Sequence, residues 1–71
     1  MEIHKIVKAI RLEIGLSQKR LAKELLVSFA AVNRWENNRS KPNQIAHHAL
    51  LELARKNDVD TKLIQALEDA K

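Results

Sequence analysis

Apolar residues recur at helical spacing from the beginning of the chain. The first series occupies one face of a helix, because its members lie four, three and four residues apart: Ile3, Val7, Ile10 and Ile14. Gly15 follows directly, and glycine readily takes the left-handed conformation that closes many helices. We therefore expect a first helix that ends at this glycine.

Four further helices are indicated by similar groups. The groups are, in order, Leu21, Ala22 and Leu25; Val32 and Trp35; Ile45, Ala49, Leu50 and Leu53; and Leu63, Ile64 and Leu67. No stretch alternates apolar and polar residues, as a half-buried strand would. The pattern predicts an all-α fold of five helices in one domain over residues 1–71.

Three helix starts share one local pattern. Ser17, Ser28 and Asp60 can each cap a helix by accepting a hydrogen bond from a free backbone N–H. Each cap lies between two apolar residues that can pack on each other: Leu16 and Leu21, Val27 and Val32, and Val59 and Ile64. The fourth helix is expected to begin after Pro42, with Asn43 as its cap.

The connection between the second and third helices is short. We expect the second helix to end at Leu25 and the third to be capped by Ser28, so only Leu26 and Val27 separate them. Such a helix-turn-helix projects its second helix outward, where that helix can enter a major groove of DNA.

The outer face of the third helix, about residues 29–37, is unusual for a solvent-facing surface. It groups small apolar side chains, amides and a guanidinium: Phe29, Ala30, Asn33, Arg34 and Asn37. The major groove offers thymine methyls as well as donors and acceptors, so Phe29 and Ala30 can meet methyls and Asn33 can pair with adenine. Arg34 can pair with guanine or with a phosphate.

Other interpretations of this face remain open. Phe29 lies about 60° from Val32 at roughly 100° per residue, so it could instead cover the core. Ala30 could be present only as a good helix former, and Arg34 could contact phosphate alone.

The net charge of +4 is unevenly distributed. Residues 1–41 carry nine Lys and Arg against four Asp and Glu, whereas residues 42–71 carry four against five. A basic region is expected of a protein that binds a polyanion, although a net charge of this size also serves ordinary solubility.

The composition argues against several other classes of protein. With no cysteine, disulfides and thiolate metal sites are excluded, which is compatible with a reducing cytoplasm. The charged, amphipathic N-terminal segment predicts neither a signal peptide nor a membrane span.

An enzymatic function is not expected, nor is a cofactor or a metal. The sequence contains neither a Gly-rich phosphate loop nor a Cys nucleophile. His47 and His48 are adjacent, so they point about 100° apart on a helix and cannot chelate as an i, i+4 pair could. We expect both of them, and His4, at the surface.

The segment GLSQKRLAKELLVSFAAVNRWENNRSKP resembles the XRE helix-turn-helix family of phage repressor and Cro proteins. Its positions that match the family pattern are Gln18, Ala22, Val27, Ser28 and the run Trp35-Glu36-Asn37-Asn38. The resemblance covers about residues 5–56. It implies a lambda-repressor-like domain that binds double-stranded DNA, commonly as a two-fold homodimer on a near-palindromic site.

The resemblance also assigns roles to residues. Phe29, Ala30 and Arg34 match base-reading positions, and the start of the second helix and the loop after the third match phosphate-contacting segments. Together with the residues above, the candidate DNA-binding set is Ser17, Gln18, Ser28, Phe29, Ala30, Asn33, Arg34, Asn37, Arg39, Ser40 and Lys41. Arg39 and Lys41 could equally be solvated loop charges, and the same holds for the cations of the second helix: Lys19, Arg20 and Lys23.

An ion pair between Arg11 and Glu36 is expected for two reasons. Glu36 lies only about 40° from Val32 around the third helix, at roughly 100° per residue, and a carboxylate so close to the core needs a partner. Arg11 lies beside the apolar stripe of the first helix, and the same pair occurs in the resembled family.

The chain departs from the family pattern at two positions. Leu26 stands where the family usually has glycine, and a bulky residue in the left-handed region costs about 1–2 kcal/mol. The turn is therefore either strained or differently shaped. Asn38 replaces a second glycine, which is milder because Asn tolerates positive φ better than most residues.

The sequence thus predicts a DNA-binding transcriptional regulator of the repressor kind. Two other functions stay open. The chain could be the DNA-targeting fragment of a larger enzyme or toxin–antitoxin complex, or it could be a protein-interaction module that uses the Phe29 face.

Overall fold

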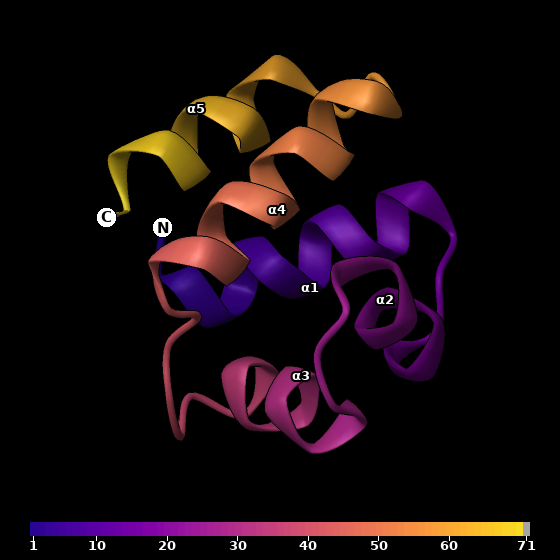
Figure 1. Ribbon diagram of the computed structural model, residues 1–71. Coiled ribbons are helices and arrows are strands. Elements are labelled where there is room, and N and C mark those ends of the chain that lie inside the picture. Colours follow the sequence, from indigo (N-terminus) through magenta and orange to yellow (C-terminus); the bar gives the residue numbers. More distant parts are fainter. Residues whose placement is uncertain (71) are drawn as a thin grey trace.

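The computed structural model describes residues 1–70, and all their regular structure is helical. The five helices are α1 (Ile3–Ile14), α2 (Gln18–Leu25), α3 (Phe29–Glu36), α4 (Gln44–Lys56) and α5 (Thr61–Asp69) (Figure 1). The expected all-α fold is confirmed. The third helix ends one residue earlier than expected, because Asn37, at φ −95° and ψ 12°, is its C-terminal cap.

Helix α1 occupies the middle of the fold. It packs against α3, α4 and α5, and α2 packs chiefly against α3 (Figure 1). The helix-turn-helix of α2 and α3 therefore lies on one side of α1, and α4 and α5 lie on the other. Among residues 1–70, no other helix covers the outer face of α3.

Each of the five helices contributes to one apolar core. The largest side chains with no accessible surface are Ile6, Val7, Ile10, Leu21, Val32, Leu50 and Leu67. Burying an aliphatic side chain of this size contributes about 1.5–3 kcal/mol. The residues that form this core are all apolar within residues 1–70, so the core is held together by packing of apolar groups.

The four helix starts expected from the sequence carry side-chain caps. The capping oxygens accept from backbone N–H groups at 2.8–3.0 Å: Ser17 from Arg20, Ser28 from Ala31, Asn43 from Ala46 and Asp60 from Lys62. The preceding residues Leu16 and Val27 pack on the core, and Val59 is buried. These caps fix where α2, α3, α4 and α5 begin.

The expected core face of α4 is wrong at its first position. Ile45 is 82% exposed, and α4 buries Ala46, Leu50, Leu51 and Ala54 instead. Ile45 lies five residues before Leu50, which at about 100° per residue turns it roughly 140° away from the core. Hydrophobic character at a helical spacing therefore identified the helix but not every member of its buried face.

The expectation that the histidines lie at the surface holds only for His48, which is exposed. The His4 side chain is 19% exposed. Nε2 of His47 lies 2.7 Å from the Leu67 carbonyl, a hydrogen bond that ties α4 to α5. Among the described residues no group of three or more His, Cys, Asp or Glu is placed to hold a metal ion.

No helix within residues 1–70 combines the length and apolar character that crossing a bilayer requires.

The turn between α2 and α3 is strained at Leu26. This residue adopts φ 57° and ψ 42°, the left-handed conformation, which decides between the two expected possibilities in favour of the strained turn. Its side chain is 92% exposed, so no buried surface offsets the strain. The backbone N–H of Val27 donates to the Ala22 carbonyl at 3.0 Å and closes the end of α2. Asn38 also has positive φ, at 59°, and so does Asp58, at 52°, which the sequence did not indicate.

Replacing Leu26 with glycine is expected to stabilise the protein. The change removes a steric cost of about 1–2 kcal/mol, and part of this gain is offset because glycine makes the unfolded chain more flexible. The expected net gain is up to about 1 kcal/mol in the free energy of unfolding, measured by urea denaturation. Leu26→Ala is the matched control, since it keeps the Cβ atom and the strain. A lower midpoint for Leu26→Gly than for Leu26→Ala would show that the flexibility of glycine in the unfolded chain outweighs the relief of strain.

Candidate nucleic-acid interface

Arg11 of α1 and Glu36 of α3 form the ion pair expected from the sequence. Arg11 Nε donates to Glu36 Oε2 at 2.7 Å, and Arg11 Nη2 donates to Glu36 Oε1 at 2.9 Å. The two side chains are only 11% and 4% exposed. Arg11 Nη1 also donates to the Leu16 carbonyl at 2.9 Å. One guanidinium therefore holds α3 and the turn before α2 against α1.

The same carboxylate begins a chain of hydrogen bonds that reaches the outer side of α3. Gln18 Nε2 donates to Glu36 Oε1 at 3.0 Å, and Asn33 Nδ2 donates to Gln18 Oε1 at 3.1 Å. Gln18 is the first residue of α2, so this chain fixes the angle between α2 and α3. This bridging role was not predicted, because the sequence pattern indicated only DNA contacts for Gln18 and Asn33.

The electrostatics of the pair favour the charged forms. Burial raises the pKa of the Glu36 carboxyl, but hydrogen bonds from Arg11 and Gln18 and the charges of Arg11 and Lys8 outweigh it and hold the pKa below its usual value. The hydrogen bond to Glu36 raises the pKa of the Arg11 guanidinium, against the opposing effect of burial. Both groups therefore remain ionised at neutral pH.

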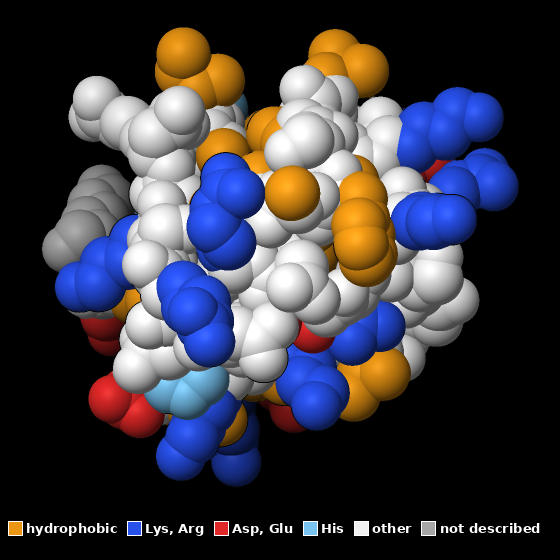
Figure 2. Space-filling model, turned by 90° about the horizontal axis from the view of Figure 1, so that it is seen from below, with side chains coloured by type: hydrophobic (Ala, Val, Ile, Leu, Met, Phe, Trp, Pro, Cys, Tyr) orange, Lys and Arg blue, Asp and Glu red, His pale blue; other side chains and the backbone are white. Residues whose placement is uncertain are grey.

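The outer face of α3 carries the side chains that the sequence analysis singled out. Phe29 is 46% exposed, which excludes a position inside the core. Ala30 and Arg34 are exposed, and Asn33 is half-buried. Figure 2 views the molecule from the α3 side and shows Lys and Arg side chains spread over this face, with apolar groups between them.

Two other candidate residues take part in local hydrogen bonds. The Ser28 hydroxyl accepts from Ala31 N–H as the cap of α3. Asn37 Nδ2 donates to the Asn33 carbonyl at 2.8 Å and so helps to close the same helix. A hydroxyl and an amide each retain further donor or acceptor capacity beyond one bond. The structure gives both residues a role at the ends of α3.

The loop between α3 and α4 continues the basic surface. Arg39, Ser40 and Lys41 are exposed, and the backbone N–H of Arg39 donates to the Arg34 carbonyl at 2.9 Å. Within residues 1–70 the ion pairs involve neither Arg34 nor Arg39 nor Lys41. These three side chains therefore carry positive charge without a direct ion pair to a described carboxylate, although Lys41 lines a surface hollow together with Glu2 and Asp69.

A helix-turn-helix family model matches residues 7–46, which is more than half of the 71 residues. The match contains α2 and α3 completely, and it includes every candidate residue named above. Searches among curated proteins and among solved structures returned no match.

Removing Arg11 is expected to destabilise the fold strongly. Arg11→Met keeps much of the side-chain volume but leaves the Glu36 carboxylate buried without its partner, which costs about 3–5 kcal/mol. The loss is measured as the change in the free energy of unfolding at neutral pH. Arg55→Met is the matched control, because Arg55 bonds Glu52 and Glu68 at an exposed surface and such pairs contribute little. An unchanged melting midpoint for Arg11→Met would contradict the proposed importance of the pair.

The stability supplied by the Glu36 carboxylate is expected to depend on pH. Its pKa is lowered in the folded state, so the stabilisation is present above the unfolded pKa of about 4.3 and is lost as the pH falls through the folded pKa. The difference in unfolding free energy between the wild type and Glu36→Gln should therefore be largest near neutral pH and shrink in acid. Denaturation series at several pH values test this, and a difference that grows in acid would refute it.

Proposed function

The chain belongs to the XRE-type helix-turn-helix family of DNA-binding domains, and from that premise we propose that it binds a specific double-stranded site through α3. In this proposal α3 enters the major groove and α2 lies across the phosphate backbone. The protein then regulates transcription by occupying a promoter, in the manner of a repressor.

The exposed face of α3 is the observation that carries this proposal. A helix with its side chains is about 10–12 Å across, which matches the roughly 12 Å width of the major groove. Phe29 and Ala30 present apolar groups suited to thymine methyls, and Arg34 presents donors suited to guanine. Asn33 keeps a second N–H and its carbonyl oxygen after bonding Gln18, so its amide can still pair with adenine.

Contacts to the phosphate backbone of the DNA would hold the domain in register without reading the base sequence. The first N–H groups of α2, near Ser17 and Gln18, face a position where the helix dipole favours an anion. At the other end of α3, Arg39, Ser40 and Lys41 can contact phosphate from the loop. We further propose that two copies bind a near-palindromic site with two-fold symmetry, as the family commonly does.

A protein-interaction function is the second candidate, and the exposure of Phe29 is the observation that favours it. Aromatic side chains are enriched in protein interfaces. The two functions differ in their response to salt. The affinity for DNA falls steeply as the salt concentration rises, because the release of counterions from DNA becomes less favourable. Selection from a random pool of duplexes, followed by a salt titration of the selected site, distinguishes them.

Lys41→Ala is expected to weaken binding to the selected duplex and to a scrambled duplex by the same factor. A phosphate contact carries no direct sequence information, so its loss should lower the salt slope by about one unit on both DNAs. Fluorescence anisotropy titrations at several salt concentrations measure both quantities. A loss confined to the selected duplex would assign Lys41 to base recognition instead.

Arg34→Ala and Phe29→Ala are expected to weaken binding to the selected duplex more than binding to the scrambled one. The difference should be about 1–3 kcal/mol for a side chain that reads a base. Ile45→Ala is the control for Phe29→Ala, because Ile45 is also a large exposed apolar residue, at 82% against 46% for Phe29, but belongs to α4. Equal losses on both duplexes would show that α3 does not read bases through Arg34 or Phe29. No loss on either duplex would favour the protein-interaction function.

A further inference from the structure

Two hollows adjoin at the end of the molecule where α1 and α4 begin and α5 ends (Figure 1). They share three lining residues, Ile3, Lys41 and Ala70, and their volumes are about 280 and 260 Å³. The first, which we call the basic hollow, is completed by Pro42, Gln44 and His47, and the second, the acidic hollow, by Glu2, Asn38 and Asp69. Sites for small molecules measure about 300–1,000 Å³, so the occupant of this place is small.

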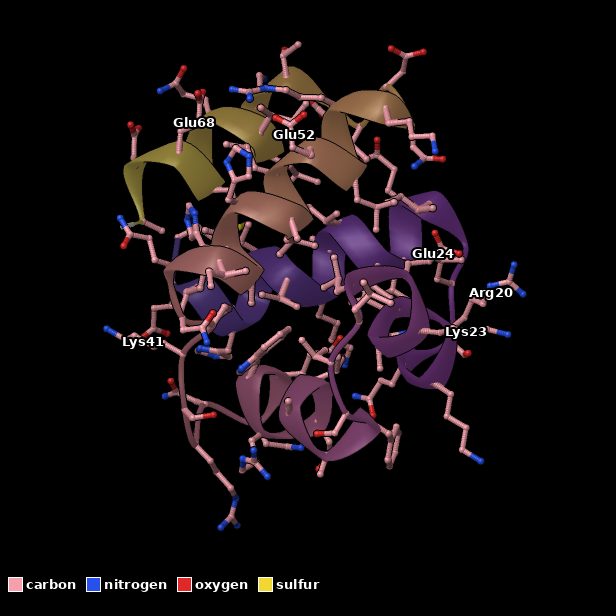
Figure 3. All side chains as sticks on the ribbon, viewed as in Figure 1. Arg20, Lys23, Glu24, Lys41, Glu52 and Glu68 are labelled. Atoms are coloured by element: carbon pink, nitrogen blue, oxygen red, sulfur yellow. The ribbon has the colours of Figure 1, made fainter. Side chains whose placement is uncertain are left out.

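The basic hollow has the chemistry of a carboxylate site. The described residues that line it include a cation and an amide but no carboxylate. Lys41, which Figure 3 shows extending at this end of the molecule, forms no ion pair within residues 1–70. Gln44 is the first residue of α4, and the free backbone N–H groups and the dipole at a helix start also favour an anion. His47 is held in the wall by its bond to the Leu67 carbonyl.

The acidic hollow adds the carboxylates of Glu2 and Asp69. Both residues are exposed, and neither pairs with a Lys or Arg within residues 1–70. Glu2 lies 3.8 Å from His4 Nε2, and Asp69 accepts from Gln65 Nε2 at 3.0 Å. A carboxylate has about four acceptor positions, so both groups can accept further hydrogen bonds from a ligand ammonium.

The opposite charges of the acidic hollow do not neutralise each other directly. Lys41 lines this hollow together with Glu2 and Asp69, yet it forms an ion pair with neither. A ligand that carries both charges can bridge such groups, whereas a simple anion is repelled by the two carboxylates. Ile3 and Ala70, which belong to both hollows, supply apolar surface for the rest of the ligand.

We propose that the two hollows together bind a small zwitterion, a free α-amino acid with an apolar side chain, in competition with DNA. The ligand carboxylate lies against Lys41 and the start of α4, and the ammonium lies against Glu2 and Asp69. Lys41 cannot pair with this carboxylate and with a DNA phosphate at the same time, so the bound amino acid lowers the affinity for DNA. The competition rests on the DNA-binding function proposed above, whereas the site itself does not.

Binding of L-leucine to the free protein tests the site. Two analogues each lack one charge: 4-methylpentanoate has no ammonium, and 3-methylbutylamine has no carboxylate. Each should bind the wild type about fivefold more weakly than leucine does, as expected for the loss of one exposed ionic contact. The affinities are measured by NMR titration of the backbone amides, and the shifted signals should belong to residues around the two hollows.

Variants of the charged residues assign each half of the ligand. In K41Q the preference for leucine over 3-methylbutylamine should shrink, while the preference over 4-methylpentanoate persists. In E2Q/D69N the pattern should be reversed. R39Q and E52Q are the matched controls, because Arg39 and Glu52 are exposed and line neither hollow, and both should keep the wild-type preferences.

The competition is tested with the selected duplex. Saturating leucine should weaken DNA binding by the wild type by the same factor as K41Q does, and it should lower the salt slope by about one unit. Leucine has no net charge at neutral pH, so its addition leaves the ionic strength unchanged. DNA binding by K41Q should not respond to leucine, and DNA should weaken leucine binding by the wild type by the same factor as leucine weakens DNA binding.

The outcomes separate this inference from the proposed function. If leucine does not bind the free protein, or if all three ligands bind equally, the site is overturned and the DNA-binding function stands. If leucine binds but leaves the DNA affinity unchanged while K41Q lowers it, the competition is overturned. If the wild type binds leucine with the expected preferences but binds no DNA, the proposed function is refuted and the amino-acid site stands.

Discussion

The buried carboxylate of Glu36 is the constraint on which the geometry of the helix-turn-helix depends. A charged group that is 4% exposed must be compensated, and the compensation comes from Arg11 on α1 and Gln18 on α2. The two donors belong to different helices and bond the same carboxylate of α3. The requirement to satisfy one buried charge thereby fixes α1, α2 and α3 relative to one another. Packing of aliphatic side chains alone would define this arrangement less selectively, because such side chains are interchangeable.

The strained turn at Leu26, unlike the arrangement around Glu36, is not fixed by contacts of its own side chain. Leu26 is held at positive φ with its side chain in solvent, so nothing that the residue itself contacts explains the conformation. The cause lies on either side of it, because Leu25 and Val32 must both reach the core while only Leu26 and Val27 connect the helices. Burial of two apolar residues at about 1.5–3 kcal/mol each outweighs a local strain of about 1–2 kcal/mol. The short connection thus specifies the sharp angle between α2 and α3, and the loss of stability is modest.

The sequence was sufficient to predict the helices, because caps and helical periodicity are local properties of neighbouring residues. The partnership of Arg11 with Glu36 also followed, from the position of a carboxylate near the core together with the family resemblance. For Leu26 the resemblance left two possibilities, a strained turn or a turn of different shape, and the structure shows the strained one. The exposure of Ile45 and the hydrogen bond of His47 to Leu67 did not follow. Both depend on how α4 is rotated against α1 and α5, and a periodicity within one helix contains no information about that rotation.

The role of Gln18 escaped the sequence analysis for a related reason, and it changes how the reading face is understood. Gln18 lies between the buried ion pair and Asn33, so the amide that we propose to read a base is oriented through the same network that orients the helices. An Asn33 side chain placed in this way loses less conformational freedom on meeting a base than a freely rotating one, which favours binding. The stability of the fold and the orientation of the Asn33 amide on the proposed reading face therefore have a common physical origin in the carboxylate of Glu36.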